Sequence, residues 1–279
     1  MTERPTVFCD LDGVIWLAHE PIAGSVEAVS RLRQSGHRVI FVTNNSFATI
    51  GEQIEALGAI GIPAAGDVLT SAMACARLIK PDDRVLVCGG PGIVEAVRSQ
   101  GGLVLDHDRV DRRLDEVDVV IVGFHRHFDY EIMRRAAQAV RSGAVFLATN
   151  DDATYPTPDG EIPGGGSILA AIETAAGCRA EVAGKPHRAM ATALREIAHL
   201  SGSVRGGPVD LSSPGIMVGD RPSTDGEFAR TLGSQFALVR SGVTAPHWTV
   251  ESHPEHFGSC PITFDFADLR ALADFLTAS

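Results

Sequence analysis

Short apolar runs rich in β-branched residues alternate along this chain with segments of helical periodicity. The runs read TVFCD, RVIFVTN, RVLVCG, DVVIVGF, AVFLATN, GIMVGD and QFALVR. Between them, apolar residues recur at i, i+4 and i+7, as at Ile50, Ile54 and Leu57, and again from Met190 to Ile197. Strands that alternate with helices form parallel sheets through right-handed crossovers, so we predict a doubly wound α/β fold.

Two segments interrupt this alternation and indicate an inserted domain. The segment IKPDDRV (79–85) carries a proline and paired acids, and AGCRAEVAGKP (176–186) is rich in small residues. The part between them has strands and helices of its own. We therefore predict a core of residues 1–80 and 181–279, with an inserted α/β domain at 81–180. The Gly/Pro/Ser-rich segment 201–215 is predicted to be a solvent-facing loop.

Composition narrows the class of protein. Hydrophobic residues make up 44% of the chain, which is enough for a sizeable core, and the net charge of −11 argues against nucleic acid or an anionic membrane as the main partner. The five cysteines are scattered and form no CxxC pair, so neither a disulfide framework nor a zinc site is predicted. The chain shows no apolar signal region or membrane-length run, so we expect a soluble protein of a reducing cytoplasm.

The stretch TVFCDLDG places two acids where a predicted strand ends. Residues i and i+2 of a strand point to the same side, roughly 6.5 Å apart, so Asp10 and Asp12 lie close together. Two such carboxylates repel each other unless a cation lies between them or one is protonated. Gly13 allows a tight turn out of the strand. A single Asp here would fit a simple turn cap, but the pair favours a functional site.

Two further segments offer groups for binding an anion. In VTNNS, Thr43, Asn44 and Asn45 supply a hydroxyl and amides near a predicted helix N-terminus, where anions bind well; an ordinary Asn-rich cap is the alternative. Lys185 precedes Pro186, a favoured residue of a helix's first turn. A cation is disfavoured near a helix N-terminus, which suggests that its charge serves an anion; a solvated surface lysine is the alternative.

A second pair of acids follows the run GIMVG. Asp220 ends that run and Asp225 comes shortly after, although either could simply cap a helix. Ligands of open α/β sheets bind beyond the carboxyl ends of the strands, so we expect these polar groups to meet there. Several acids with one lysine and few histidines favour a hard cation with oxygen ligands, and hence Mg²⁺ over zinc.

The segments DLDGV, VTNNS, GKP and VGDRPSTD occur in an order that resembles the four motifs of the haloacid dehalogenase-like superfamily. More narrowly, the chain resembles the subfamily IIA phosphatases, which include 4-nitrophenylphosphatase-like, phosphoglycolate, pyridoxal phosphate and NagD-type nucleotide phosphatases. The resemblance covers nearly the full length of the chain. The subfamily's pattern is also matched by the segments TSAMACA, FLATNDDATYPTPDG, PGGGSILAAIE and LVRSGVT.

The resemblance implies catalytic roles for three residues. Asp10 would be the nucleophile that forms an aspartyl-phosphate, and Asp12 would protonate the leaving oxygen and later deprotonate the hydrolytic water. Lys185 would pair with Asp10 and with the phosphoryl group. Mg²⁺ and the lysine would offset the repulsion between a carboxylate nucleophile and a phosphate dianion.

The resemblance also implies a phosphate site and a metal site. Thr43 and Asn44 would hydrogen-bond the transferring phosphoryl group, with Asn45 beside them in the same site. The implied metal ligands come from four acids, Asp10, Asp12 through its main-chain carbonyl, Asp220 and Asp225, the last of which would orient the metal's water or neighbouring loops.

The segment 81–180 corresponds to the family's cap domain, whose loop over the leaving group sets specificity. Its counterpart here is TNDDATYP, with Asn150, Asp151, Asp152 and Tyr155 as candidate substrate-binding residues. We expect Tyr155 to contact the leaving group, with packing at the domain seam as the alternative. The resemblance also implies a homodimer formed through the cap.

These features together predict a Mg²⁺-dependent phosphatase of small phosphorylated metabolites. The candidate substrates are sugar phosphates, glycerol phosphate, phosphoglycolate, nucleoside monophosphates and pyridoxal phosphate. A non-catalytic metabolite-binding module on the same fold is one alternative. A NAD-binding oxidoreductase is another, but the glycines of VLVCGGPGIVEAV lack the spacing of a dinucleotide fingerprint, and a tight turn between strand and helix accounts for them.

Overall fold

The computed structural model describes residues 4–17, 19–106, 114–157, 160–200, 215–257, 259 and 261–278. Within them the chain forms two compact units. The first unit comprises Met1–Thr43, Gln53–Leu69 and Lys185–Ser279, and the second comprises Asn44–Glu52 and Thr70–Gly184. The domain division at 80/81 and 180/181 stays a prediction. The predicted loop at 201–215 lies, apart from Gly215, outside the described residues.

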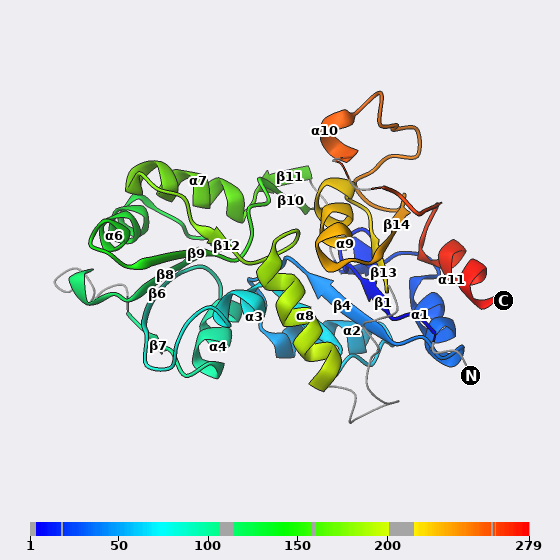
Figure 1. Cartoon of the computed structure of the whole chain (residues 1–279), viewed down its shortest axis with the longest axis horizontal. Helices are drawn as coiled ribbons and strands as arrows, with labels where there is room; N and C mark the ends of the chain where they lie inside the picture. The colour runs from blue at the N-terminus through cyan, green and yellow to red at the C-terminus, as the bar shows by residue number, and fades with distance from the viewer. Residues whose placement is uncertain are drawn as a thin grey trace. The chain divides into compact units, whose positions relative to one another are not determined.

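The first unit is built on a sheet of six described strands, β1 (Val7–Cys9), β4 (Val39–Thr43), β5 (Val68–Thr70), β13 (Ile216–Gly219), β14 (Gln235–Val239) and β15 (Phe264–Phe266). Their order is β15-β14-β13-β1-β4-β5, and Figure 1 labels the four central strands, β14, β13, β1 and β4. β1 is parallel to both of its neighbours, and β14 is parallel to β13 and β15. All residues of β1, β4 and β13 are buried, as continuous apolar runs predict for a parallel sheet.

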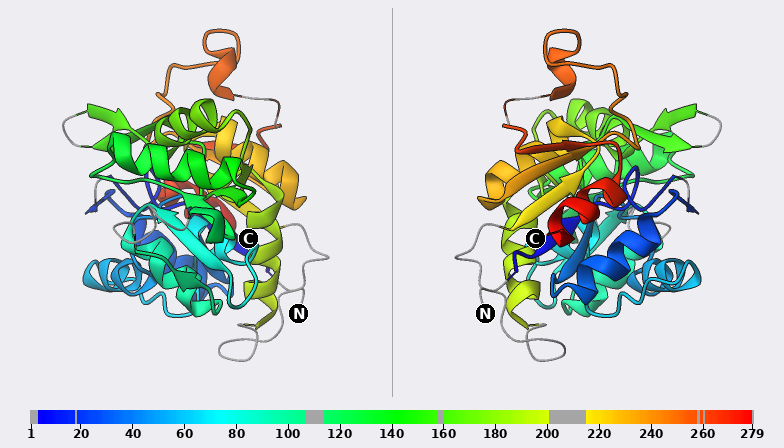
Figure 2. Two further views of the ribbon diagram at one scale, coloured as in Figure 1. Left: turned by 90° about the vertical axis from the view of Figure 1, so that its left-hand side faces the viewer. Right: turned by 90° about the vertical axis from the view of Figure 1, so that its right-hand side faces the viewer.

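Helices cover both faces of this sheet. α1 (Ser25–Gln34) packs on α11 (Leu269–Thr277), and α8 (Arg188–Leu200) packs on α9 (Glu227–Leu232) (Figure 2). Right-handed crossovers account for the two faces, because the chain leaves β1 toward β4 but leaves β13 in the opposite direction, toward β14. The unit also contains α2 (Ile50–Ala59), whose first turn belongs to the second unit, and β2 (Trp16–Leu17), β3 (Glu20–Pro21), the π-helical turn η3 (Pro222–Gly226) and α10 (Pro254–Phe257).

The second unit has a parallel sheet of its own. Its described strands are β6 (Arg84–Cys88), β7 (Leu103–Val104), β8 (Val119–Val122), β9 (Val145–Ala148) and β12 (Glu181–Val182), in the order β12-β9-β8-β6-β7. Each neighbouring pair is parallel. The remaining elements are α3 (Ser71–Ala76), α4 (Pro91–Ser99), η1 (Leu114–Glu116), α6 (Tyr130–Arg141), the antiparallel hairpin β10 (Thr154–Thr157) and β11 (Gly160–Pro163), and α7 (Gly165–Ala176).

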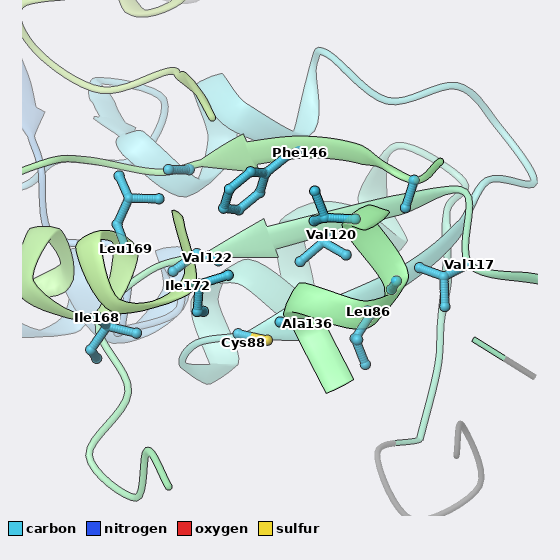
Figure 3. Packing of buried hydrophobic residues seen from close by; sticks show 14 residues of the cluster. Leu86, Cys88, Val117, Val120, Val122, Ala136, Phe146, Ile168, Leu169 and Ile172 are labelled. Carbon is cyan, nitrogen blue, oxygen red and sulfur yellow. The ribbon is translucent and has the colours of Figure 1, made fainter. Parts of the chain in front are cut away.

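The core of the second unit lies between this sheet and the helices α6 and α7. Leu86, Val120 and Phe146 from the strands meet Ile172 of α7 in one buried cluster (Figure 3). α6 begins where the Asp129 side chain accepts a hydrogen bond from the backbone N–H of the first turn. Burial of one face of each helix against the sheet therefore holds this unit together.

The glycine-rich turn between β6 and α4 has a packing explanation. A β-carbon on Gly90 would overlap the Phe47 ring, and one on Gly92 would overlap the main chain of Ala48. The close approach of these backbones requires glycine, which agrees with the tight turn expected from the sequence.

The predicted fold class is confirmed. Each of the apolar runs quoted from the sequence contains a strand, and the two segments of helical spacing are α2 and α8. Cys9, Cys75 and Cys88 are buried in the interior, and Cys178 is exposed without a disulfide partner among the described residues. In the part of the chain that the structure describes, no helix has both the length and the apolar character that crossing a bilayer requires.

Truncation of Ile172 to alanine is expected to destabilise the second unit. Its side chain is fully buried in the cluster, so Ile172→Ala removes packed atoms and leaves a cavity, at a cost of about 2–5 kcal/mol. The free energy of unfolding from urea titration measures this loss. Val145→Ala is the control, because Val145 is 55% exposed and its truncation should change stability by no more than about 0.5 kcal/mol. Equal losses in the two variants would contradict this account of the core.

Candidate active site

The central strands of the first sheet end at the predicted site residues. Asp10 follows β1, Asp220 follows β13, and Thr43 is the last residue of β4. Because β1 pairs in parallel with β13 and with β4, and Cys9 lies level with Val218 and Phe41, these ends meet at one edge of the sheet. Polar groups that the sequence separates widely are thereby brought together where open α/β sheets bind ligands.

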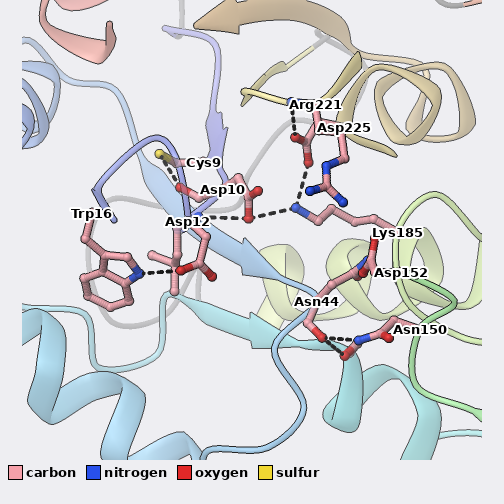
Figure 4. Close-up of polar contacts among 12 residues, drawn as sticks. Cys9, Asp10, Asp12, Trp16, Asn44, Asn150, Asp152, Lys185, Arg221 and Asp225 are labelled. Carbon is pink, nitrogen blue, oxygen red and sulfur yellow. Dashed lines mark hydrogen bonds and ion pairs between the residues drawn. The ribbon is translucent and has the colours of Figure 1, made fainter. Parts of the chain in front are cut away.

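A buried lysine joins two of the acids. The Lys185 ammonium lies 2.8 Å from Asp10 Oδ1 and 2.7 Å from Asp225 Oδ1, and Figure 4 shows it between the two carboxylates. Asp10 Oδ1 also accepts the backbone N–H of Leu11, and Asp225 Oδ2 accepts that of Arg221. The Lys185 side chain is only 2% exposed and that of Asp225 only 1%, so these ion pairs form largely out of water.

Asp220 is held by loops from two other parts of the first unit. Its Oδ2 accepts the backbone N–H of Val243 at 2.6 Å, and the hydroxyl of Thr244 donates to its main-chain carbonyl. A β-carbon on either Gly13 or Gly242 would overlap the Asp220 carboxylate. The backbones on both sides therefore approach this side chain as closely as glycine permits.

Three carboxylates of this site lie near enough to share a cation. Ligand oxygens of Asp10, Asp220 and Asp225 all fall within 4.8 Å of one another. Burial, and then the negative charge of Asp225, raise the pKa of Asp220 to about 7. Burial likewise raises the pKa of Asp10 well above its ordinary value, against the opposing effect of Lys185. Burial thus disfavours the charged forms of Asp10 and Asp220, and a divalent cation with oxygen ligands would offset that cost.

The carboxylates also affect the lysine. Burial alone would lower the pKa of the Lys185 ammonium, but Asp10 and Asp225 raise it above its ordinary value. Lys185 is therefore a permanent cation at neutral pH and acts as a charge, not as a base.

Asp12 stands apart from the three clustered carboxylates. Its Oδ1 accepts a hydrogen bond from the indole Nε1 of Trp16 at 3.1 Å, and burial raises the pKa of this carboxyl group. Trp16 thus supplies a polar contact within the site. A buried indole N–H needs a hydrogen-bond acceptor. The spacing of four residues between Asp12 and Trp16 is the sequence feature that could have predicted this hydrogen bond.

Asn44 and Asn45 belong to the second unit, and their side chains have different roles there. The Asn44 amide donates to Asp152 Oδ2 at 2.8 Å. The Asn45 Oδ1 accepts the backbone N–H groups of Phe47 and Ala48, at 3.0 and 3.4 Å. Asn45 thus forms a local turn and does not cap α2, which begins at Ile50, while its place in a phosphate site stays a prediction.

Two residues of the predicted cap loop, Asp152 and Tyr155, contact other side chains of the second unit. Asp152 accepts the Asn44 amide, and the Tyr155 ring stacks on Phe124 with 5.6 Å between centroids. Contact of either residue with a substrate stays a prediction.

The structure thus gathers Asp10, Lys185, Asp220 and Asp225 into one cluster and places Thr43 at the end of the adjacent strand. The sequence did not predict the parts that Trp16, Gly242 and Thr244 take in this site. The segment LVRSGVT contains the last two, but its composition alone does not show that it folds around Asp220.

Comparison with protein families identifies two matching regions. Residues 7–102 match the model described as haloacid dehalogenase-like hydrolase, and residues 182–260 match a second model, described as HAD-hydrolase-like. The two regions contain the Asp10, Thr43, Lys185 and Asp220 segments.

Named relatives extend the similarity over nearly the whole chain. A D-glycerol 3-phosphate phosphatase of Mycobacterium tuberculosis is 34% identical over 90% of this chain and 67% of its own length. An acid sugar phosphatase of Staphylococcus saprophyticus is 33% identical over 94% of this chain and 93% of its own. The crystal structure of a glycerol phosphate phosphatase from Mycobacterium tuberculosis in complex with magnesium has a TM-score of 0.79 and 32% identity, over 97% of this chain and 77% of that one.

With divalent cations removed by a chelator, the free energy of unfolding is expected to fall as the pH rises. Burial raises the pKa of Asp220 from 3.8 to about 7, so the folded protein holds a proton that the unfolded chain releases. This stabilisation is complete below about pH 4 and is lost as the pH rises through 7. Between pH 5 and 7.5 the loss should be roughly 2 kcal/mol, measurable by urea titration.

Saturating Mg²⁺ should reduce this pH dependence, because a bound cation favours the ionised carboxylates. Asp220→Asn provides the control and should make the pH dependence in chelator less steep, and Asp10 and Asp12, whose pKa values burial also raises, account for the remainder. The charged groups that influence Asp220 are Asp225, Arg221 and Lys185. The same slope in wild type and Asp220→Asn would assign the titration to another group.

Gly13→Ala is expected to weaken divalent-cation binding, and Gly66→Ala is its matched control. Both glycines have a φ of +80°, so both substitutions carry a similar backbone strain of about 1–2 kcal/mol. Only the new β-carbon at Gly13 meets Asp220, whereas the one at Gly66 has no neighbour within 4 Å. Isothermal titration should show at least about a tenfold loss of Mg²⁺ affinity for Gly13→Ala alone. Equal affinities in the two variants would refute the role of this close approach.

Proposed function

The chain belongs to the haloacid dehalogenase-like hydrolase family as one of its phosphatases, and from this membership we propose that it hydrolyses small phosphomonoesters with Mg²⁺ through an aspartyl-phosphate on Asp10. The observation that carries the proposal is the buried cluster in which Lys185 pairs with Asp10 beside Asp220 and Asp225. Such a cluster supplies a nucleophile, a fixed cation and oxygen ligands within one small volume.

The cluster suits a reaction between two anions. A carboxylate that attacks a phosphate dianion meets like-charge repulsion, which nearby positive charge reduces most strongly where water is excluded. Lys185 brings one such charge within 2.8 Å of Asp10. Mg²⁺ would be held by Asp10, Asp220 and the main-chain carbonyl of Asp12, with Asp225 orienting its surroundings, and would supply further positive charge at the phosphoryl group.

Hydrolysis then proceeds in two displacements on the chain's own residues. A carboxylate oxygen of Asp10 forms a bond to phosphorus while the bond to the ester oxygen breaks, and Asp12 gives its proton to that leaving oxygen. Water next attacks the phosphorus of the aspartyl-phosphate and passes a proton to Asp12. Inorganic phosphate leaves, and Asp10 returns to its carboxylate form. The Trp16 indole keeps Asp12 oriented during both steps.

The substrates we propose are the phosphates of small polyols and sugars. Relatives named for D-glycerol 3-phosphate and for acid sugar phosphates support this class. Thr43 and Asn44 would hydrogen-bond the transferring phosphoryl group, and Tyr155 would contact the leaving group. A homodimer through the 81–180 domain stays a prediction.

Phosphate release from a panel of esters is expected to require both Mg²⁺ and Asp10. The panel contains glycerol 3-phosphate, a sugar phosphate, phosphoglycolate, a nucleoside monophosphate and 4-nitrophenyl phosphate. Asp10→Asn keeps the shape of the side chain but removes the nucleophile, so release should fall by at least about 10⁴-fold. Asp106→Asn, which changes an exposed acid outside the site, should match the wild type.

Trapping of the intermediate completes the test. The ester carries its radiolabel in the phosphoryl group. Brief reaction followed by acid quenching should leave label on the wild-type protein and none on Asp10→Asn. Release that persists in chelator or in Asp10→Asn would refute the mechanism. No release from any ester by a folded, Mg²⁺-binding protein would favour the binding module instead.

A further inference from the structure

We propose that Asp152 is a positioning residue, which holds the Asn44 carboxamide in the orientation that binds the phosphoryl group. The inference rests on the proposed function, in which Asn44 binds that group. It differs from the sequence-based expectation that Asp152 itself contacts the substrate. Asn44 and Asp152 both belong to the second unit, and so do all the contacts that carry the argument.

The contact between the two side chains determines which way the Asn44 amide faces. Asn44 Nδ2 donates to Asp152 Oδ2 at 2.8 Å (Figure 4). An ionised carboxylate only accepts hydrogen bonds, so it must face the NH₂ group and not the oxygen of the amide. An amide nitrogen carries two N–H groups in one plane, and fixing one at Asp152 also fixes the direction of the other.

The opposite side of the Asn44 amide has little room to rotate. A β-carbon on Gly184 would lie only 2.7 Å from Asn44 Oδ1, so this glycine leaves just enough space for the oxygen. The carboxamide thus has a hydrogen bond at its nitrogen, and its oxygen faces a position where only glycine fits.

The main chain of Asn44 is fixed as firmly as its side chain. Its carbonyl oxygen accepts the Ser71 hydroxyl at 2.8 Å and the Asn150 amide at 2.6 Å. Ser71 is fully buried and Asn150 is only 6% exposed. Because the C=O and N–H of a trans peptide point in opposite directions, these two donors also set the direction of the Asn45 N–H.

The chemistry of Asp152 fits positioning better than direct contact with phosphate. A carboxylate and a phosphoryl group both accept hydrogen bonds and both carry negative charge, so they cannot bond to each other and they repel. An asparagine amide between two acceptors can donate one N–H to each. Asp152 therefore acts through Asn44, and its effect should not depend on which leaving group the ester carries.

The experiment compares Asp152→Ala, Asp152→Asn, Asn44→Ala and the Asn44→Ala/Asp152→Ala double variant, with glycerol 3-phosphate and 4-nitrophenyl phosphate as substrates. Asp152→Ala should lower kcat/KM about tenfold for both esters, because both present the same phosphoryl group. Asp152→Asn keeps an oxygen that can accept the Asn44 amide and should restore most of the loss. Glu55→Ala removes an exposed carboxylate of α2, outside the site and the cap loop, and should match the wild type.

The double variant and phosphate binding identify the route of the effect. If Asp152 acts through Asn44, the double variant should be no worse than Asn44→Ala alone. The affinity for inorganic phosphate, measured by calorimetry, should fall in Asp152→Ala and show the same non-additivity. Thermal unfolding checks that each variant remains folded.

Distinct results separate failure of this inference from failure of the proposed function. Losses in Asp152→Ala that differ several-fold between the two esters, or that add to those of Asn44→Ala, would overturn the positioning role while phosphatase activity stands. Unchanged kcat/KM in Asp152→Ala would do the same. A wild type that neither releases nor binds phosphate would overturn both proposals.

Discussion

The site of the first unit depends on the two ion pairs that the buried Lys185 ammonium forms. Its Nζ lies 2.8 Å from one oxygen of Asp10 and 2.7 Å from one of Asp225. Moving such charges out of water costs several kcal/mol per ion, and an apolar replacement of a buried ion pair is often as stable or more stable. Stability is therefore a weak reason for this cluster, and a reaction that needs opposed charges in a dry site is a better one.

The parallel sheet explains how residues so far apart in the sequence reach this lysine. β1 lies between β13 and β4, and all three point the same way. The ends of the three strands therefore lie at the same edge, which brings together Asp10 and Asp220, directly after β1 and β13, and Thr43, the last residue of β4. Buried apolar strands supply the stability, so the residues just beyond their ends can be chosen for chemistry.

The sequence predicted the elements and the clustered residues better than it predicted their partners. Continuous apolar runs mark buried strands because hydrophobicity is a local property, and the acids that follow them are visible in the same way. Hydrogen bonds such as Trp16 to Asp12 or Asn44 to Asp152 depend on tertiary packing, which no local pattern encodes. Asn45 is the contrasting case, because its side chain accepts a hydrogen bond from Phe47, only two residues away, and such a local turn can be expected from the sequence.

The close packing around Asp220 restricts how a protein of this kind can diverge. Gly13 and Gly242 come from separate loops, and neither leaves room for a β-carbon beside the carboxylate. Any side chain at either glycine would displace the Asp220 carboxylate, and one at Gly242 would also meet the main chain of Gly13. Single substitutions at Gly13 and Gly242 are therefore expected to disturb the site. Substitutions elsewhere in the chain can change the contacts made to a leaving group without disturbing this packing.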